Sequence, residues 1–201
     1  MEKPAETQYP INELLKQRWS PLAFADKIVS SDVLLSLLEA AKWSPSCFNE
    51  QPWSFIVATK ENPAEYERLL SCIVEGNQPW ASLAPVLMLS VTKLFFDRNN
   101  QPNRHAFHDV GLAVASLTFQ ATEMGLRVHQ MGGFHLDKAR ELYKISEGYE
   151  PVAAIAIGYP EKPDILPESL QARELSPRSR KPINSFVFTG EFGKTASFIS
   201  F

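Results

Sequence analysis

Two stretches of the chain carry basic and hydroxyl side chains that could bind a phosphate. Arg18 and Ser20 follow a predicted short helix, and Arg178 and Arg180 lie between two prolines near the C-terminus. Guanidinium groups match phosphate oxygens, and arginines two positions apart in an extended segment can point the same way. Taken alone, the first stretch is more typical of a capped loop and the second of a solvated basic turn.

A third stretch, the loop 44–53, presents hydroxyl and amide side chains between a predicted helix and a predicted strand. Prolines at positions 45 and 52 make this loop rigid. Small polar groups on a rigid loop suit a planar polar ligand. A turn in which Ser and Asn side chains bond their own backbone explains the stretch equally well.

Motifs for other chemistries are missing from the sequence. It has no GxGxxG after a strand, no P-loop, no GxSxG and no HExxH. Its two cysteines, Cys47 and Cys72, form no CxxC pair, which argues against a zinc finger or a disulfide scaffold. His105 and His108 are three positions apart, but the start of a solvated helix explains them better than a metal pair. We therefore expect no metal site.

The composition is that of an ordinary globular protein with a single domain, 1–201. The 201 residues are 44% hydrophobic and 21% charged. Twenty basic and 23 acidic residues leave a net charge of -3, which gives no electrostatic reason to expect nucleic acid or an acidic membrane. Residues 1–15 lack the apolar region of a signal peptide, and the apolar stretch 83–91 is too short to span a bilayer. We expect a cytoplasmic protein.

The hydrophobic pattern predicts helices that alternate with short strands. Helical spacing and capping residues predict helices at 31–43, 63–74, 105–124 and 136–143, after a short helical stretch that begins at Pro10. Short apolar runs predict strands at 54–59, 85–92, 126–131 and 151–159. This order predicts an α+β or α/β sheet flanked by helices.

Segment 160–201 differs in composition from the rest of the chain. It holds five prolines and is too polar to form a core. Its basic cluster is Arg173, Arg178, Arg180 and Lys181, and its phenylalanines are Phe186, Phe188, Phe192, Phe198 and Phe201. Exposed aromatic side chains in an extended arm predict that this segment lies on another surface, such as a second subunit.

Together, the three polar stretches resemble the FMN-dependent nitroreductase superfamily, and the resemblance covers nearly the whole chain. Arg18, Ser20 and Phe24 match the family's opening Arg-x-Ser-x-(Arg or Lys)-x-(Phe or Tyr) motif. The most specific match, to Pro-Ser-x-x-Asn-x-Gln-Pro-Trp, consists of Pro45, Ser46, Asn49, Gln51, Pro52 and Trp53. Further matches are Asn77 ahead of Ala84-Pro85, the segment 123–133, Gly158-Tyr159-Pro160, and the pair Arg178 and Arg180.

The resemblance implies an α+β fold with a central mixed or antiparallel sheet flanked by helices, and a C-terminal arm swapped onto a partner subunit. It also implies a homodimer with FMN at the subunit interface. In each site the phosphate would be held by Arg18, Arg178 and Arg180, and the ribityl chain or ring would meet Ser20 and the backbone of Trp19. Asn77 would bond the pyrimidine edge, and N5 and O4 would face the backbone of Met131, Gly132 and Gly133. The partner subunit would contribute Pro45, Ser46, Cys47 and Asn49.

Leu22 departs from the family pattern because it stands where the family usually has Arg or Lys. This change removes one cation from the FMN site, so we expect either weaker FMN binding or compensation from elsewhere. Trp80, Phe95, Phe96 and Phe107 could wall the substrate pocket, although core or loop packing explains them better.

The activity implied by the resemblance is hydride transfer from NADH or NADPH through FMN to an electron-poor acceptor, such as a nitroaromatic or a quinone, in a ping-pong scheme. The flavin carries this chemistry, so we expect no catalytic side chain. One alternative is a dehalogenase or flavin-modifying enzyme of the same fold. Another, which Leu22 favours, is a flavin-binding or storage protein with little turnover. The sequence identifies neither the acceptor nor the preferred nicotinamide.

Overall fold

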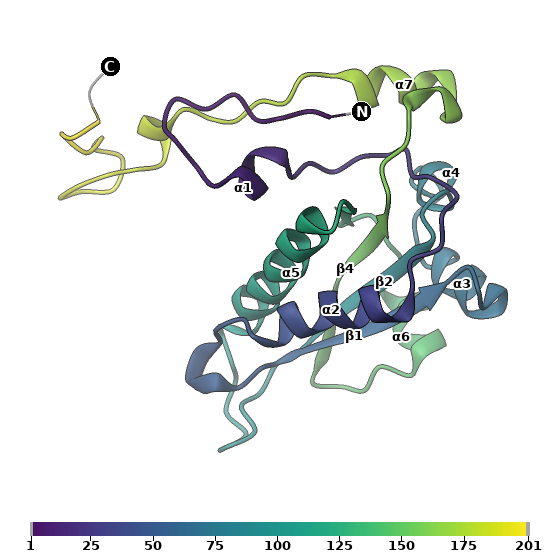
Figure 1. The fold of residues 1–201 in the computed structure, drawn as a ribbon. Coiled ribbons are helices and arrows are strands. Elements are labelled where there is room, and N and C mark those ends of the chain that lie inside the picture. The colour runs from purple at the N-terminus through teal and green to yellow at the C-terminus, as the bar shows by residue number, and fades with distance from the viewer. Residues whose placement is uncertain (1, 200–201) are drawn as a thin grey trace.

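The computed structural model describes residues 2–199 and contains a four-stranded antiparallel sheet (Figure 1). Its strands are β1 Trp53–Thr59, β2 Val86–Lys93, β3 Arg127–Met131 and β4 Tyr149–Gly158, in the order β1-β2-β4-β3. Met88 in β2 lies opposite Val57 of β1 on one side and Ile155 of β4 on the other. The predicted α+β class is confirmed, and the sheet is antiparallel rather than mixed.

The described residues also form seven α-helices and three short 3-10 turns. The helices are α1 Glu13–Gln17, α2 Ser31–Lys42, α3 Pro63–Leu70, α4 Gln78–Ala81, α5 Ala106–Glu123, α6 Leu136–Tyr143 and α7 Glu168–Leu175. The 3-10 turns are η1 Cys47–Asn49, η2 Pro163–Ile165 and η3 Ile183–Ser185.

Helices cover both faces of the sheet, because successive side chains of a strand point to opposite faces. In β2, Met88 belongs to a core cluster that includes Leu117 of α5. Leu87 and Leu89 belong to the cluster on the other face, together with Tyr66 of α3. A strand covered on both sides appears in the sequence as a continuous apolar run, as the segment 85–92 does.

Local sequence signals set several helix ends. The Ser30 hydroxyl accepts the N–H of Val33 at 3.4 Å at the start of α2, as the sequence predicted. Pro63 occupies the first turn of α3, where a missing N–H costs nothing. Gly125 follows α5 with φ of +77°, a left-handed conformation that favours glycine.

Helix α3 is shorter than the predicted helix 63–74, because the chain leaves the helix after Leu70. The N–H of Val74 instead donates to the carbonyl of Gly133 at 3.1 Å. A β-branched residue suits such extended pairing better than a helix end. The pairing brings Asn77 beside the glycine turn that follows β3.

Segment 160–175, which was predicted to belong to the extended arm, packs on the sheet domain. Pro160 forms a bridge with Phe24, and Leu166 and Glu174 are 4% and 2% exposed. Pro163 begins the 3-10 turn η2, and Pro167 occupies the N-cap position of α7. Neither proline interrupts α7, because both precede its first residue. The extended arm therefore begins after Ser176.

The two ends of the chain run together away from the sheet (Figure 1). The N–H of Ala5 donates to the Lys16 carbonyl at 2.8 Å, and Arg178 Nη1 donates to the same carbonyl at 2.9 Å. Within residues 2–199, no hydrogen bond joins 179–199 to the rest of the chain. Phe192 and Phe198 are 97% and 77% exposed; Phe201 lies outside the described residues.

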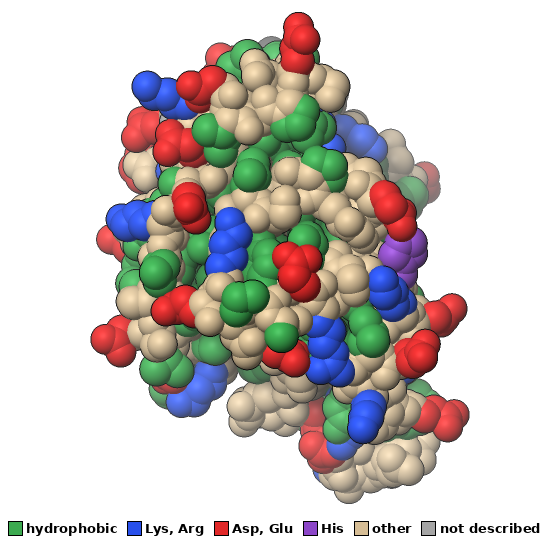
Figure 2. All heavy atoms as spheres, turned by 90° about the vertical axis from the view of Figure 1, so that its right-hand side faces the viewer, with side chains coloured by type: hydrophobic (Ala, Val, Ile, Leu, Met, Phe, Trp, Pro, Cys, Tyr) green, Lys and Arg blue, Asp and Glu red, His purple; other side chains and the backbone are tan. Residues whose placement is uncertain are grey.

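Figure 2 faces the end of the molecule that carries α3, α4 and α7. Acidic and basic side chains are interspersed over this face, and no continuous basic patch crosses it. Among residues 2–199, no helix has both the length and the apolar character needed to cross a membrane.

Candidate functional site

A cavity of about 220 Å³ lies where the start of the chain, the end of α1 and the start of the arm meet. Its lining residues are Lys3, Arg18, Trp19, Ser20, Leu22, His129, Arg173, Glu174, Arg178 and Arg180. Arg18, Ser20 and the pair Arg178 and Arg180, which lie at opposite ends of the sequence, are thus brought to one pocket. We call it the basic pocket.

The basic pocket holds cations that repel one another. Burial lowers the pKa of the Arg18 guanidinium, and the positive charges of Arg178 and Arg180 lower it further. Burial also lowers the pKa of Arg178, and the charge of Arg180 adds to this shift. An anion bound among these groups would stabilise their charged forms. The electrostatics of the pocket therefore suit an anionic ligand.

Hydrogen-bond donors in the basic pocket lack acceptors. The indole N–H of Trp19 is buried without an acceptor among the described residues. Arg18 Nη1 lies 3.4 Å from the Ser20 hydroxyl oxygen, a long hydrogen bond. Arg180 Nη1 donates to the carbonyl of its neighbour Ser179 at 2.7 Å, which leaves other N–H groups of its fork for a ligand. A ligand with several acceptor oxygens, such as a phosphate monoester, fits this donor set.

Leu22 contributes backbone rather than charge to the basic pocket. Its side chain is 2% exposed within the core cluster, and its N–H donates to Glu174 Oε2 at 2.8 Å. Burial raises the pKa of the Glu174 carboxyl, while the N–H groups of Leu22 and Ala23 and the charge of Lys3 act against this shift. An Arg or Lys at position 22 would place its charged side chain in the core cluster, where the Leu22 side chain lies.

A line of contacts leads from the basic pocket to the glycine turn after β3. The ring of His129, which lines the pocket, lies 4.3 Å from the ring of Trp80, measured between centroids. Trp80 Nε1 donates to Asn77 Oδ1 at 3.3 Å, and Asn77 Nδ2 donates to the Gly133 carbonyl at 3.5 Å. Asn77 and Gly133, predicted to meet the same ligand, are therefore neighbours.

His129 offers an acceptor to the basic pocket. Its Nδ1 lies 2.7 Å from the Pro21 carbonyl, which can only accept, so Nδ1 carries the proton and Nε2 does not. Burial lowers the pKa of His129 to about 4; the bond to Pro21 acts against this shift, and the charge of Arg173 adds to it. A neutral imidazole can accept a hydrogen bond from a hydroxyl group at Nε2.

The glycine turn gives a ligand access to backbone groups. Gly132 is exposed, and a Cβ built on it would meet no atom within 4 Å. A Cβ on Gly133 would lie 2.7 Å from Asn77 Nδ2, so a larger residue here would push the Asn77 amide out of its present position. Met131 is 4% exposed, so its side chain is not available to a ligand.

The loop 44–52 follows the C-terminal end of α2 (Figure 1). Its backbone is strained: Phe48, Asn49 and Gln51 have φ of +53°, +58° and +49°. Residues other than glycine rarely adopt such angles, and strain of this kind concentrates at functional sites. Asp109 holds the loop, because its Oδ2 accepts the N–H of Cys47 at 3.0 Å.

Four of the predicted site residues lie on this loop and do not line the basic pocket of their own chain. They are Pro45, Ser46, Cys47 and Asn49. The remaining predicted residues form the basic pocket or the line of contacts from it to the glycine turn. One chain therefore presents two separate parts of the predicted site.

Residues 15–159 match the Nitroreductase family. The chain belongs to this family. The matched range contains Arg18, the loop 44–52, Asn77 and the glycine turn, whereas Lys3 and the arginine pair of the arm lie outside it.

Solved structures and curated relatives agree with the nitroreductase assignment. A solved structure described as an oxidoreductase containing FMN has a TM-score of 0.89 and 34% identity, and the comparison covers 94% of this chain and 96% of the other. A Streptococcus pneumoniae nitroreductase family protein shares the fold, with a TM-score of 0.69 and 22% identity over 87% of this chain and 97% of its own. A Stenotrophomonas maltophilia (strain R551-3) protein named "Putative NADH dehydrogenase/NAD(P)H nitroreductase" is 26% identical over 78% of this chain and 88% of its own.

A shorter relative matches only part of this chain. An uncharacterised 15.4 kDa protein of Mycolicibacterium smegmatis is 32% identical over 90 residues, or 45% of this chain. The chain spans 60% of that relative's length.

Four residues of the basic pocket were not predicted as ligands from the sequence: Lys3, His129, Arg173 and Glu174. Arg173 had a signal, because it belongs to the basic cluster of segment 160–201. Lys3 lies in a polar stretch without periodicity, and His129 lies in a short strand whose partner elements the sequence does not specify.

Proposed function

We propose that this member of the Nitroreductase family is an FMN-dependent oxidoreductase, which takes electrons from NADH or NADPH and reduces an electron-poor acceptor such as a nitroaromatic or a quinone. The basic pocket, with its mutually repelling arginines, is the observation that carries the proposal. The similarity to an oxidoreductase containing FMN, at 34% identity over 94% of this chain, supports it.

FMN fits the residues that the chain brings together. Arg18, Arg178 and Arg180 would hold the phosphate, because they share a pocket in which burial and the charges of Arg178 and Arg180 lower the pKa of Arg18. Ser20 and the backbone of Trp19 would contact the ribityl chain or ring. Asn77 and the backbone of 131–133 would meet the pyrimidine edge and N5, since the line of contacts from the basic pocket leads to them.

A homodimer would complete each site. The arm exposes aromatic side chains and bonds only within itself from Ser179 to Ile199, which suits a segment that packs on another subunit. In such a dimer the loop 44–52 of the partner subunit would supply the part of the site that one chain's basic pocket lacks. The contributing groups would be the partner subunit's Pro45, Ser46, Cys47 and Asn49.

When bound, FMN would supply the redox chemistry, which is hydride transfer between a nicotinamide and the acceptor. The chain's own residues bind and orient. The basic pocket anchors the phosphate, and Asn77 and the glycine turn offer hydrogen-bonding groups to the polar edge of a planar ring. No side chain is required as nucleophile or general base. Nicotinamide and acceptor would use one pocket in turn, which predicts ping-pong kinetics.

An absorbance spectrum of the purified protein, followed by steady-state kinetics, tests this function. We expect flavin bands, release of FMN on heating, and NADH or NADPH consumption that requires an added quinone or nitroaromatic. Double-reciprocal plots of rate against nicotinamide concentration, each at a different fixed acceptor concentration, should be parallel. A colourless protein that fails to bind added FMN would refute the proposal. A yellow protein that consumes neither nicotinamide would indicate flavin storage.

A further inference from the structure

The N-terminal segment brings a lysine to the basic pocket. Lys3 lines the same cavity as Arg18, Arg178 and Arg180. Its Nζ lies 5.1 Å from the centroid of the Trp19 ring, which also lines this cavity. Figure 1 shows the start of the chain beside α7, at the position where the arm begins.

Hydrogen bonds hold Lys3 in this position. Its ammonium group donates to the carbonyls of Glu174 and Ser176, each at 2.5 Å. An ammonium group has three N–H donors, so one remains for a ligand. The backbone carbonyl of Lys3 accepts from Arg178 Nη1 at 2.5 Å. Lys3 is thus fixed directly beside an arginine that we assign to the phosphate.

Lys3 adds a positive charge that the matched part of the chain does not provide. Leu22 is buried in the core and brings no charge to the pocket. Lys3 lies before residues 15–159, the range that matches the Nitroreductase family. The pocket therefore receives this cation from outside the matched range.

We propose that Lys3 is a phosphate-binding residue of this protein, which adds a cation to a pocket where Leu22 supplies none. This inference rests on the proposed function, since it deepens the assignment of the FMN site. Lys3 lies at the phosphate end of the site, so it distinguishes FMN from riboflavin, which has the same ring and ribityl chain without the phosphate.

The test is a titration of the full-length protein and its variants with FMN and with riboflavin, followed by flavin fluorescence. Lys3→Met should weaken FMN binding by about 10- to 100-fold, the effect of losing one hydrogen bond to a charged group. Riboflavin binding should not change. Lys3→Arg, which keeps the charge, should retain most of the FMN affinity.

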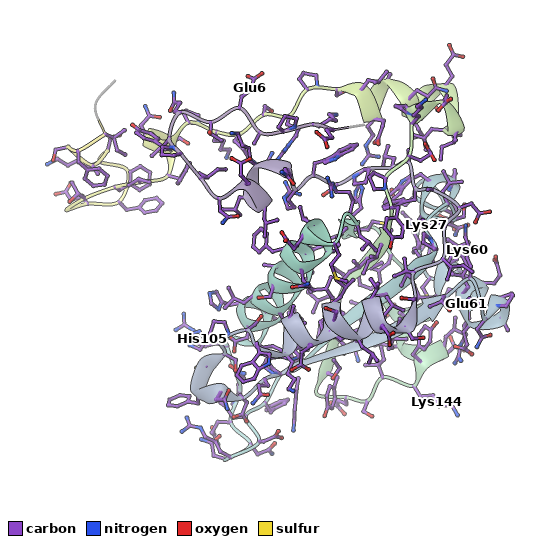
Figure 3. The ribbon with its side chains drawn as sticks, in the orientation of Figure 1. Glu6, Lys27, Lys60, Glu61, His105 and Lys144 are labelled. Carbon is purple, nitrogen blue, oxygen red and sulfur yellow. The ribbon has the colours of Figure 1, made fainter. Side chains whose placement is uncertain are left out.

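Lys60→Met is the matched control. Lys60 also donates to a backbone carbonyl, that of Leu83 at 3.0 Å, and its Nζ lies 6.0 Å from the Tyr66 ring. It does not line the basic pocket, and Figure 3 shows it beside Glu61, away from the N-terminal segment that contains Glu6. This variant should bind both flavins as the wild type does.

The outcomes separate the inference from the proposed function. Equal losses of FMN and riboflavin affinity in Lys3→Met would mean that Lys3 supports the fold of the whole site rather than the phosphate, and would overturn the inference. Unchanged FMN affinity would overturn it too, as would a wild type that binds both flavins equally well. A wild type that binds neither flavin would refute the proposed function itself.

Lysine acylation of the wild type, read by mass spectrometry, provides a measurement that does not depend on a variant folding. FMN should protect Lys3, riboflavin should not, and Lys60 should react equally in every sample. Equal acylation of Lys3 with and without FMN would overturn the inference.

Discussion

The carboxylate of Glu174 accepts the N–H of Leu22 at 2.8 Å, which ties α7 to the segment that follows α1. Both residues are 2% exposed. The other carboxylate oxygen of Glu174 is buried without a donor among residues 2–199. A carboxylate in a basic pocket would weaken the binding of an anion. The bond to Leu22 indicates that Glu174 stabilises the fold instead.

Glu174→Ala is expected to destabilise the protein by about 1–3 kcal/mol, because it leaves a buried N–H without an acceptor. Glu174→Gln keeps an acceptor oxygen for Leu22 and removes a buried charge, so it should cost less. Urea unfolding of the wild type and both variants measures the difference. Equal destabilisation by Ala and Gln would contradict the role of the Leu22 bond.

Arg180→Ala should weaken FMN binding by about 10- to 100-fold without a comparable loss of stability, because a charge-assisted phosphate contact is lost. Arg178→Ala should affect both properties. Arg178 Nη1 also donates to the carbonyls of Lys3 and Lys16, at 2.5 and 2.9 Å. FMN titrations and thermal melting curves separate the two effects. Retention of FMN by Arg180→Ala on dialysis would refute its assignment to the phosphate.

The sequence predicted those parts of the fold and site that depend on local patterns. The apolar run 85–92 identified the central strand, because its residues are covered on both faces. Arg18 and Arg178 were recognised through family motifs at both ends of the chain, and the structure places them in one pocket. Their meeting depends on how the chain ends return to each other, which no local pattern encodes.

Other features depend on three-dimensional context and were not predicted. No helix was predicted around Pro167, which occupies the N-cap position of α7, where a missing N–H is tolerated. Val74 continued a helical pattern, but pairing with Gly133 outweighed that propensity. Lys3 has no sequence signal, because its position depends on carbonyls at the end of α7.

His129→Gln is expected to reduce the loss of stability that acid causes in the wild type. The pKa of His129 is lowered from 6.5 to about 4 in the folded chain. Between these values the unfolded chain binds a proton that the folded chain does not, so the contribution of His129 is complete above pH 6.5 and declines as the pH falls toward 4. At pH 5 this effect should cost the wild type about 2 kcal/mol relative to pH 7.

Urea unfolding of the wild type and His129→Gln at pH 7 and pH 5 measures this contribution. Other titrating groups are common to both proteins, so the difference between the two pH effects isolates His129. Parallel losses of stability in the two proteins would contradict the lowered pKa.

Removal of residues 183–201 should convert the proposed dimer to a folded monomer. From Ser179 to Ile199 the arm forms hydrogen bonds only within itself, so its loss should cost the sheet domain little. Phe192 is 97% exposed, although its ring lies 5.1 Å from that of Phe188 in the same arm, measured between centroids, so most of its surface is available to a partner. Sedimentation gives the mass, and circular dichroism gives the helical content.

Truncation before Pro177 is the matched comparison, because it also removes Arg178 and Arg180. It should abolish FMN retention on dialysis, whereas the shorter truncation keeps both arginines and should retain more FMN.

A 183–201 deletion that remains dimeric would refute the arm as the dimer contact. Loss of helical signal in that deletion would show that the arm supports its own chain. Equal FMN retention by the two truncations would refute a phosphate role for the arginine pair, because only the longer truncation removes it.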